Sequence, residues 1–549
     1  MEPPCWPGNP FVTRLKCPAP ISEVFIAELA ESVCKRLEVL SGRKNFLDFG
    51  EFADFSSPLA LKLSKEEKRN PIELAEEWAE KIDVPGVSTR VTGGFLNFFL
   101  TEEAILHNLK KITHFKSPGK TAVIDYSSPN IAKPFSVGHL RSTIIGESLR
   151  RVLELLGWKT YGINFVGDWG TQFGKLLAAY ERWPVDLKEE PIKKLLELYV
   201  RFHREAEKDK ELEEEGKEWF RRLEEGDKVA VERWKKFREL SMKEFQRIYR
   251  ILGTTELIDA GESFFVKDSK ELVDELLERG IAKKDKGAVV VPLEDKPPMI
   301  LRKSDGTTIY SSRDLASALW RIRKFRPDLM LYVVGNEQSL HFQQLFEVLK
   351  KLEVKTRFEH VSFGLVRLPE GKMSTRKGRV VFLEDVLEEA VRRIEKIMVE
   401  RGGSKEDAEK IGVGAVKFAD LKTNRTREVK FSWDMLSMEG DTGPYVQYAA
   451  VRAKRIVEKF GRGKPGLDAE FEPLARKLVR FRIAVMETAK LRRPDILASY
   501  LLEISKKFNE LYVKKRIGGV PEREWLTERT YLVLEKGLEL LGIETPGRM

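Results

Sequence analysis

Short apolar runs alternate with helical patterns from Thr121 to about Leu368, and this alternation constrains the fold more than any other feature. A chain of this kind buries its runs as strands of a mostly parallel sheet covered by helices. The runs are Ala122–Asp125, Thr160–Val166, Val289–Val291, Leu329–Val334 and Val361–Val366. We therefore expect a doubly wound domain whose ligands bind beyond the carboxyl ends of its strands.

The segments on either side have different patterns. Residues 1–116 predict a small α/β module, with helices in Ile21–Leu40 and Pro71–Ile82 and an alternating strand in Gly94–Leu100. His114–Lys120, which contains Ser-Pro-Gly, is the expected linker. After the segment ending at Gly378 the chain is helical almost to its end, which predicts a C-terminal α-helical bundle. Its expected helices are Glu384–Glu400, Tyr445–Lys459, Pro473–Ala489, Arg493–Tyr512 and Arg529–Leu541.

These breaks divide the chain into expected domains at 1–116, 117–380 and 441–549, with a connecting helical region at 381–440. Within the second domain, residues from about 188 to 252 form a highly charged helical insertion with interleaved Leu, Phe and Trp. We expect a solvated helical pair packed on the sheet there. Direct contact with nucleic acid is the alternative.

Composition indicates the kind of partner and the compartment. The 549 residues include 97 Lys plus Arg and 87 Asp plus Glu, and the net charge of +10 favours a polyanionic partner. An ion-rich thermophilic surface would also explain so many charges. The three cysteines, Cys5, Cys17 and Cys34, lack metal-like spacing, so we expect neither disulfides nor zinc. Because no apolar run could span a bilayer and no signal pattern begins the chain, we expect a cytoplasmic protein without a membrane partner.

The segment from Ser128 to Gly146 places Gly138 and His139 where a helix should begin. Helix starts expose unpaired N–H groups and the positive end of the peptide dipole, which suit an anionic phosphate. A nucleotide site is the functional interpretation, and a plain turn with a helix cap is the alternative.

A second segment, Gly371–Gly378, is bounded by glycines and carries hydroxyl and basic groups. Such a loop could close over a triphosphate and neutralise charge as pyrophosphate leaves. The alternative is a solvated basic loop. Its candidate ATP-binding residues are Lys372, Met373, Ser374, Arg376 and Lys377.

Together the two segments resemble the signature sequences of class I aminoacyl-tRNA synthetases, and more closely those of the arginyl-tRNA synthetase family. The resemblance covers nearly the whole chain and implies a Rossmann-like catalytic domain. Two positions depart from the pattern: Ser136 replaces the first histidine, and Thr375 replaces the second lysine. Because Ser136 cannot carry an imidazolium charge, we expect His139 to supply more of that role. The matching segments are Ser128–Pro134, Gly138–Thr143, Gly167–Gly174, Asp305–Thr308, Tyr310–Asp314 and Asp441–Ala449.

The resemblance also implies an arginine pocket. A guanidinium is a planar fork of donors that carboxylates and an aromatic face match best. Tyr310 and Asp314 have the i, i+4 spacing that places them on one helical face. By resemblance, these two residues and Glu262 hold the arginine head, Asn130 binds the α-amino or carboxylate end, and Gln338 lines the pocket. Taken alone, such acids are more often surface carboxylates.

The implied reaction is activation of L-arginine by ATP with Mg2+, followed by transfer to the terminal adenosine of tRNA(Arg), at its 2′-hydroxyl if class I behaviour holds. No protein nucleophile is required, and the protein itself holds no metal. The resemblance implies that activation needs bound tRNA. It assigns catalytic positions to His139, Lys372 and Ser136, and nucleotide contacts to Gly138 and His139. His341 is a further nucleotide-site candidate, with a structural role as the alternative.

The same resemblance assigns the tRNA elbow to the N-terminal module and the anticodon to the C-terminal helices. Basic side chains with interleaved aromatics suit single-stranded RNA, and Tyr448, Phe508 and Met549 are the candidate contacts. We expect a monomer that does not bind DNA. The other interpretations are a nucleotidyltransferase of the same superfamily and a non-catalytic synthetase-derived tRNA-binding protein, for which Ser136 and Thr375 would be signs of decay.

Overall fold

The structure is a computed structural model that describes residues 25–43, 47–49, 53–367, 382–399 and 404–549. The chain divides into two units. The first unit joins residues 1–118, 445–490 and 499–537, and the second joins 119–444, 491–498 and 538–549. The N-terminal module and most of the C-terminal helices therefore belong to one unit, although the sheet of the other unit lies between them in sequence.

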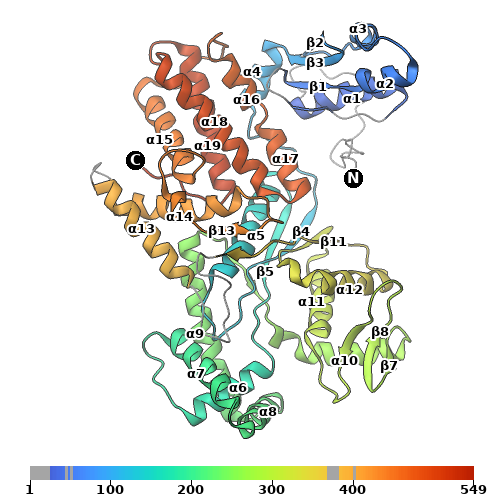
Figure 1. The fold of residues 1–549 in the computed structure, drawn as a ribbon, viewed down its shortest axis with the longest axis vertical. Coiled ribbons are helices and arrows are strands. Elements are labelled where there is room, and N and C mark those ends of the chain that lie inside the picture. Colours follow the sequence, from blue (N-terminus) through green and yellow to red (C-terminus); the bar gives the residue numbers. More distant parts are fainter. Residues whose placement is uncertain (1–24, 44–46, 50–52, 368–381, 400–403) are drawn as a thin grey trace. The chain divides into compact units, whose positions relative to one another are not determined.

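A five-stranded parallel sheet lies at the centre of the second unit, in the order β11–β10–β4–β5–β6 (Figure 1). Because β4 comes first along the chain but lies in the middle, the switch point falls between the carboxyl ends of β4 and β10. The predicted doubly wound sheet is confirmed. Its strands are β4 (Thr121–Asp125), β5 (Lys159–Asn164), β6 (Ile258–Asp259), β10 (Leu329–Tyr332) and β11 (Arg357–His360).

Two predicted strands of this sheet lie elsewhere. Val289–Val291 belongs to β8 (Ala288–Val291), the middle strand of an antiparallel sheet with β7 (Lys283–Asp285) and β9 (Met299–Arg302). Val361–Val366 follows β11, and only its last residue enters β12 (Val366–Arg367), which pairs with β13 (Val429–Lys430). These predictions were wrong because an apolar run indicates burial without identifying the neighbouring strand.

Helices pack on the sheet and bury its apolar side chains. Val123, Ile163 and Met330 of the strands lie in one core with Leu315 of α11 and Leu345 of α12. Each such side chain stabilises the fold by about 1.5–3 kcal/mol when fully buried. The helices around the sheet are α5 (Val137–Leu155), α6 (Thr171–Arg182), α10 (Val266–Glu278), α11 (Tyr310–Phe325) and α12 (Ser339–Lys351), with the short 3-10 helices η2 (Glu262–Phe265) and η3 (Asn336–Gln338).

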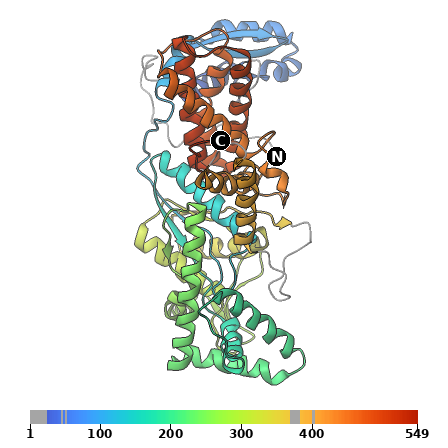
Figure 2. The ribbon, with the colours of Figure 1, turned by 90° about the vertical axis from the view of Figure 1, so that its left-hand side faces the viewer.

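The charged insertion contains three helices, not the expected pair: α7 (Pro191–Ala206), α8 (Lys210–Glu224) and α9 (Lys228–Leu252). Figure 2 shows α9 as one unbroken helix. The aromatic side chains Phe202, Phe220, Phe237 and Phe245 are buried, so they form a core and are not offered to nucleic acid. Acids and bases pair on the exposed faces, as Arg221 does with Glu218 and Glu225.

Two longer helices, α13 (Leu383–Val399) and α14 (Lys405–Leu421), and the 3-10 helix η5 (Trp433–Leu436) complete the second unit's helical region. The amphipathic pattern predicted α13 but not α14. The Ser404 side chain caps α14 by accepting the backbone N–H of Asp407 at 3.1 Å. Nearly every residue of α14 from Ile411 to Leu421 is buried. A helix buried on all sides is a nearly continuous run of small and apolar residues, so its sequence shows no helical period.

The first unit contains the N-terminal α/β module and the C-terminal helices. The predicted helix Pro71–Ile82 and strand Gly94–Leu100 are confirmed as α3 (Pro71–Lys81) and β3 (Phe95–Leu100). The other module elements are α1 (Ile26–Ser41), β1 (Phe55–Ser57), α2 (Leu59–Glu67), β2 (Val87–Thr92) and α4 (Glu102–Lys110), and the sheet order is β1–β3–β2. Residues 21–24 of the expected first helix lie outside the described residues.

The C-terminal helices are α15 (Gly443–Phe460), α16 (Glu472–Leu478), α17 (Phe481–Leu491), α18 (Pro494–Lys514) and α19 (Pro521–Leu540). The expected single helix Pro473–Ala489 is divided into α16 and α17, and α19 begins earlier than predicted. No helix in the described part of the chain is long and apolar enough to cross a membrane.

Three arginines of the helical part contact the N-terminal module within the first unit. The Arg476 Nη1 donates to Oδ2 of the buried Asp54 at 2.5 Å, and Arg480 donates to the Ala53 carbonyl at 3.1 Å. The guanidinium of Arg482 lies 3.8 Å from the ring centre of Phe25. We call Arg476, Arg480 and Arg482 with these contacts the arginine junction.

Candidate active site

The loop from β4 to α5 carries the first motif and has a strained backbone. Ser127, Ser128 and Ala132 have positive φ values of 74°, 46° and 56°, which side-chain-bearing residues rarely adopt. Neighbouring helices hold this shape: the Ser127 N–H donates to Ser142 Oγ at 2.9 Å, and the Ala132 N–H donates to Ser241 Oγ at 2.8 Å. Strain of this kind often accompanies function.

The start of α5 fixes the protonation of His139. The backbone N–H of Ser136 donates to His139 Nδ1 at 3.0 Å. Because Nδ1 is an acceptor here, the proton of the neutral ring lies on Nε2. Burial, with Lys133 nearby, lowers the pKa of His139 to about 4. The expectation that an imidazolium charge on His139 replaces the missing histidine is therefore wrong, and the ring offers a neutral Nε2–H donor beside the helix N-terminus.

Asn130 lies where β4 and β5 end. Its backbone pairs with Gly167, which donates to the Pro129 carbonyl at 3.0 Å. A Cβ on Gly167 would lie 2.0 Å from Asn130 Oδ1. Gly167, the first glycine of the Gly-Asp-Trp-Gly segment, is therefore required for the Asn130 side chain to occupy its position.

Asp168, the next residue of that segment, holds the loop that carries Glu262. The buried Asp168 carboxylate accepts the N–H and the hydroxyl of Ser263, each at 2.8 Å, and the Arg238 Nε–H at 2.9 Å. Gly261 makes this possible, because a Cβ there would lie 2.6 Å from Asp168 Oδ2. Burial raises the pKa of Glu262 to about 7, an effect that Arg313 opposes.

The structure brings Tyr310, Asp314 and His341 together at the start of α11. The His341 Nε2 lies 2.5 Å from Asp314 Oδ2, and the rings of Tyr310 and His341 are 5.1 Å apart in an edge-to-face arrangement. Tyr310 is 53% exposed. His341 was predicted as a nucleotide contact, but its bond joins it to the predicted arginine pocket. Gln338 ends η3, just before α12 and His341, and is exposed.

The second motif, with Lys372, Met373, Ser374, Arg376 and Lys377, lies outside the described residues. The structure does describe the strand that precedes it and an arginine that anchors this strand. Arg141 of α5 is buried and donates to the carbonyls of Gly364 at 2.6 Å and Arg427 at 2.9 Å, and to Asp420 at 3.1 Å.

Sequence reasoning gave no role to Arg141 or to Arg313, whose guanidinium pairs with Glu262. A signal for Arg141 was present, because it lies at i+4 from Val137 on the apolar face of α5. A charged residue on such a face must find partners inside the protein.

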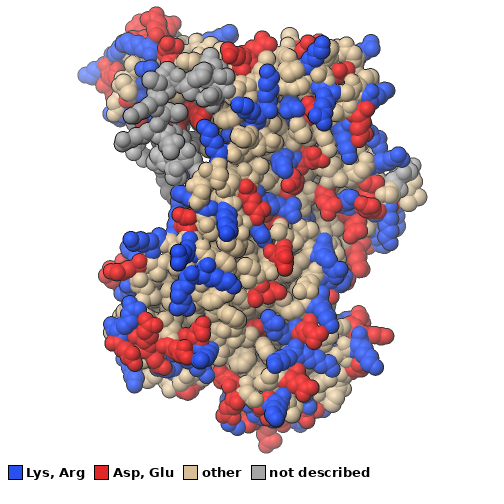
Figure 3. All heavy atoms as spheres, turned by 180° about the vertical axis from the view of Figure 1, so that it is seen from behind, with Lys and Arg blue, Asp and Glu red and all other residues tan. Residues whose placement is uncertain are grey.

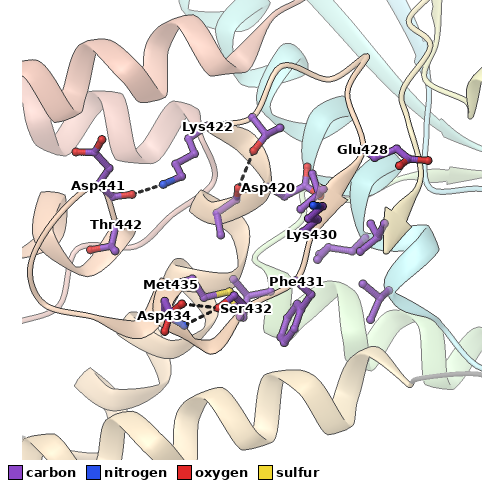
Figure 4. A pocket seen from close by; sticks show the side chains of 17 residues that line it. Asp420, Lys422, Glu428, Lys430, Phe431, Ser432, Asp434, Met435, Asp441 and Thr442 are labelled. Atoms are coloured by element: carbon purple, nitrogen blue, oxygen red, sulfur yellow. Dashed lines mark hydrogen bonds between the residues drawn. The ribbon is translucent and has the colours of Figure 1, made fainter. Parts of the chain in front are cut away.

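A cavity of about 340 Å³ lies beside α5 (Figure 4). Val137 and Leu140 line it together with residues of α14, β13 and η5, and the Lys422 ammonium donates to the Asp441 carbonyl beside it. Among the described residues, none of the predicted site residues lines this cavity.

The predicted RNA contacts differ in exposure. Phe508 is fully buried, so its ring cannot stack on a base and we assign it to the core of the helices. Tyr448 is half-buried, and the Arg452 guanidinium lies 4.4 Å from its ring centre and 4.3 Å from that of Tyr512. Met549 is partly exposed. On the face drawn in Figure 3, basic and acidic side chains lie intermixed.

Three family models match consecutive parts of the chain. Residues 26–100 match the "Arginyl tRNA synthetase N terminal domain", 101–433 match "tRNA synthetases class I (R), catalytic domain", and 446–549 match the "DALR anticodon binding domain". The parallel sheet, the α5 start and these matches define a class I aminoacyl-tRNA synthetase.

Relatives identify the family within this class. The chain is 41% identical to arginine–tRNA ligase 1 of Bacillus cereus, over 96% of this chain and 98% of the relative. It is 40% identical to arginine–tRNA ligase of Clostridium acetobutylicum, over 91% and 94%. The solved Thermus thermophilus arginyl-tRNA synthetase has a TM-score of 0.79 at 27% identity, covering 95% of this chain and all of that one. The chain belongs to the arginyl-tRNA synthetase family.

Proposed function

We propose that this chain is an arginine–tRNA ligase, which activates L-arginine with ATP and transfers it to the 3′-terminal adenosine of tRNA(Arg). The observation that carries the proposal is the pairing of Glu262 and Asp314, two carboxylates close enough to affect one another, with the exposed ring of Tyr310. A planar guanidinium satisfies two carboxylates and an aromatic face, whereas an ammonium lacks the fork that fits them.

In the first step, the carboxylate of arginine attacks the α-phosphorus of ATP, a carboxylate–phosphorus bond forms, and the bond to the β-phosphate oxygen breaks as pyrophosphate leaves. Magnesium enters with ATP as part of the substrate. In the second step, a ribose hydroxyl of tRNA, the 2′-hydroxyl by class I behaviour, attacks the carbonyl carbon and AMP leaves. The protein positions the groups and stabilises charge.

The roles of individual residues are part of the proposal. The neutral Nε2–H of His139 donates to a phosphate oxygen beside the helix N-terminus, where Gly138 allows close approach. Asn130 binds the α-amino or carboxylate end of arginine, and Gln338 lines the pocket. Lys372 and the basic residues after it neutralise the leaving pyrophosphate.

The C-terminal helices bind the anticodon in this proposal, with Tyr448 offering an aromatic face beside Arg452 and Met549 as a further contact. The N-terminal module contacts the elbow of tRNA. We further propose a cytoplasmic monomer that needs bound tRNA for arginine activation. No described feature favours the non-catalytic tRNA-binding protein or the nucleotidyltransferase.

Arginine-dependent exchange between ATP and labelled pyrophosphate, with and without tRNA, tests the activity. We expect exchange with arginine, none with lysine, and strong dependence on tRNA. Tight tRNA binding without exchange under any condition would show a non-catalytic protein, and exchange without an amino acid would indicate a nucleotidyltransferase.

A further inference from the structure

Glu262 and Asp314, the two acids of the proposed arginine pocket, are held by the protein in the same way. Glu262 Oε2 accepts the Nε–H of Arg313 at 2.7 Å, and Arg313 Nη2 lies 2.7 Å from the same oxygen in an ion pair. Asp314 Oδ2 lies 2.5 Å from His341 Nε2. Each carboxylate thus has one oxygen engaged by a nitrogen of the protein itself.

The second oxygen of each acid is open. Within the described residues, neither Glu262 Oε1 nor Asp314 Oδ1 takes part in a hydrogen bond. The two carboxylate side chains are 17% and 19% exposed, whereas those of Arg313 and His341 are only 9% exposed. The protein partners are therefore buried behind the acids, and the open oxygens are the ones a ligand can reach.

We propose that Arg313 and His341 are positioning residues that fix the rotamers of Glu262 and Asp314, so that one oxygen of each faces the guanidinium of the substrate. The inference rests on the proposed function, because it takes this pocket as the arginine site. Both carboxylates are then fixed before arginine binds. Such preorganisation raises affinity, because less ordering is needed on binding.

Charge provides a second reason for Arg313. Two carboxylates facing one guanidinium would leave an unbalanced negative charge in a largely buried pocket, which is unfavourable. Arg313 offsets one of them. Its own carbonyl partner, Thr308 at 3.3 Å, helps to hold the guanidinium in place.

The pKa of Glu262 supports this role. This pKa is raised to about 7, chiefly by burial; Arg313 opposes the rise, and Asp314 and Asp168 add to it. The other charged groups near this cluster are Arg238 of α9, which pairs with Asp168, and the buried pair of Arg321 and Asp125, which interacts with Asp314. Removing the Arg313 charge should therefore raise the pKa of Glu262 above about 7, so that the carboxyl ionises at a higher pH than in wild type.

The test compares Arg313→Gln and Arg313→Lys with wild type and with Arg323→Gln, a matched control at an exposed position of the same helix. We expect Arg313→Gln to raise the KM for arginine about tenfold or more while the KM for ATP changes less than about twofold. The arginine KM of this variant should fall as pH rises, at a higher pH than in wild type, and Arg313→Lys should recover part of the loss. Equal changes in both KM values, or a pH profile of the arginine KM that matches wild type, would overturn the role of Arg313.

His341→Gln and His341→Leu supply a second measurement that stands if the Arg313 variants fold poorly. Glutamine retains an N–H donor, so it should keep a lower arginine KM than leucine, and equal values would overturn the role of His341. Asp314→Asn separates the two levels of the proposal. If it leaves the arginine KM unchanged, the pocket itself is wrongly placed. If it raises that KM while the Arg313 and His341 variants do not, only the positioning inference fails.

Discussion

The His139 ring is held in one tautomer by the backbone of its own helix start. The Ser136 N–H occupies Nδ1 at 3.0 Å, and burial lowers the pKa of the ring to about 4. At neutral pH the ring is uncharged, so its role in the proposed ATP site is that of a hydrogen-bond donor. In this proposal the positive field at the phosphate comes from the helix N-terminus and from basic residues.

Replacing His139 distinguishes a neutral donor from a cation. We expect His139→Ala to lower kcat of arginylation about 100-fold, as loss of an oxyanion-type donor does, and His139→Gln to lose less because its amide keeps a neutral N–H. The pH dependence of wild-type kcat from about pH 6 to about pH 8 should contain no step from this ring. A larger loss with Gln than with Ala would contradict the donor role.

The buried lysine Lys417 predicts how the stability of the fold depends on pH. Lys417 of α14 donates to the carbonyls of Leu252 at 2.5 Å and of Gly542, and burial lowers its pKa to about 7. The lysine of the unfolded chain has a pKa of about 10.4. Between these values the unfolded state binds more protons, so this group makes stability rise with pH from about 7 to about 10.

Thermal unfolding of wild type and Lys417→Met at pH 7 and pH 9 measures this linkage. We expect the stability advantage of wild type to be larger at pH 9. Lys410→Met is the control on the same helix, because the pKa of Lys410 is raised and lies above this range. An advantage that does not change with pH would show that Lys417 titrates normally.

At the scale of elements, α6 and α8 approach each other at two glycines. A Cβ on Gly174 would lie 2.2 Å from the Gly216 carbonyl and 2.5 Å from Phe220 Cβ. Gly174→Ala should therefore push the helices apart and destabilise the insertion by about 1–3 kcal/mol. Gly216→Ala should have a smaller effect, because the nearest atom to its new Cβ, Lys175 Cγ, is 3.0 Å away, compared with 2.2 Å at Gly174. Hydrogen exchange in α6 and α8 measures the difference, and equal effects would exclude the proposed close approach.

Much of the element pattern could be predicted from the sequence, because long helices such as α13 and the alternating strand β3 have strong periods. The sequence did not predict which strands pair, or where a helix is interrupted. Val289–Val291 is buried in either sheet, so its pattern cannot select one, and β6 has only two residues. The break between α16 and α17 carries no proline or glycine. It depends on tertiary contacts, because Arg480 at the break bonds to Ala53.

The candidate site was predicted for its acids and aromatic residue but not for the groups behind them. Tyr310 and Asp314 follow from helical spacing, and the structure places them as expected on α11. Arg313 lies beside them in sequence, yet its partner Glu262 is 51 residues away. Only the fold brings such pairs together, and spacing along the chain contains no trace of them.

At the scale of the whole molecule, the arginine junction joins the N-terminal module to the C-terminal helices within one unit. Arg476→Ala removes the cation that bonds directly to the Asp54 carboxylate, which is 1% exposed, and leaves only the nearby Arg480. We expect this to weaken the module by about 1–3 kcal/mol and to speed hydrogen exchange in β1–β3, while the KM for arginine stays unchanged.

Lys477→Ala is the matched control, because this neighbouring residue pairs with Glu503 of α18 and bonds to no described residue of the N-terminal module. If exchange in β1–β3 accelerates equally in both variants, the helices are generally destabilised and the junction has no special role. If the arginine KM rises in Arg476→Ala alone, the junction also affects the catalytic unit.

The arginine junction sets an order of events on the ribosome. Asp54 and Arg476 are 422 residues apart, so at about 5–20 residues per second roughly 20–80 s separate their synthesis. During that interval Asp54 and Phe25 of the nascent N-terminal module lack their partners, because Arg476 and Arg482 have not yet been synthesised. The first part of this chain to be translated is therefore among the last to be completed, and nascent-chain chaperones would meet it in an unfinished state.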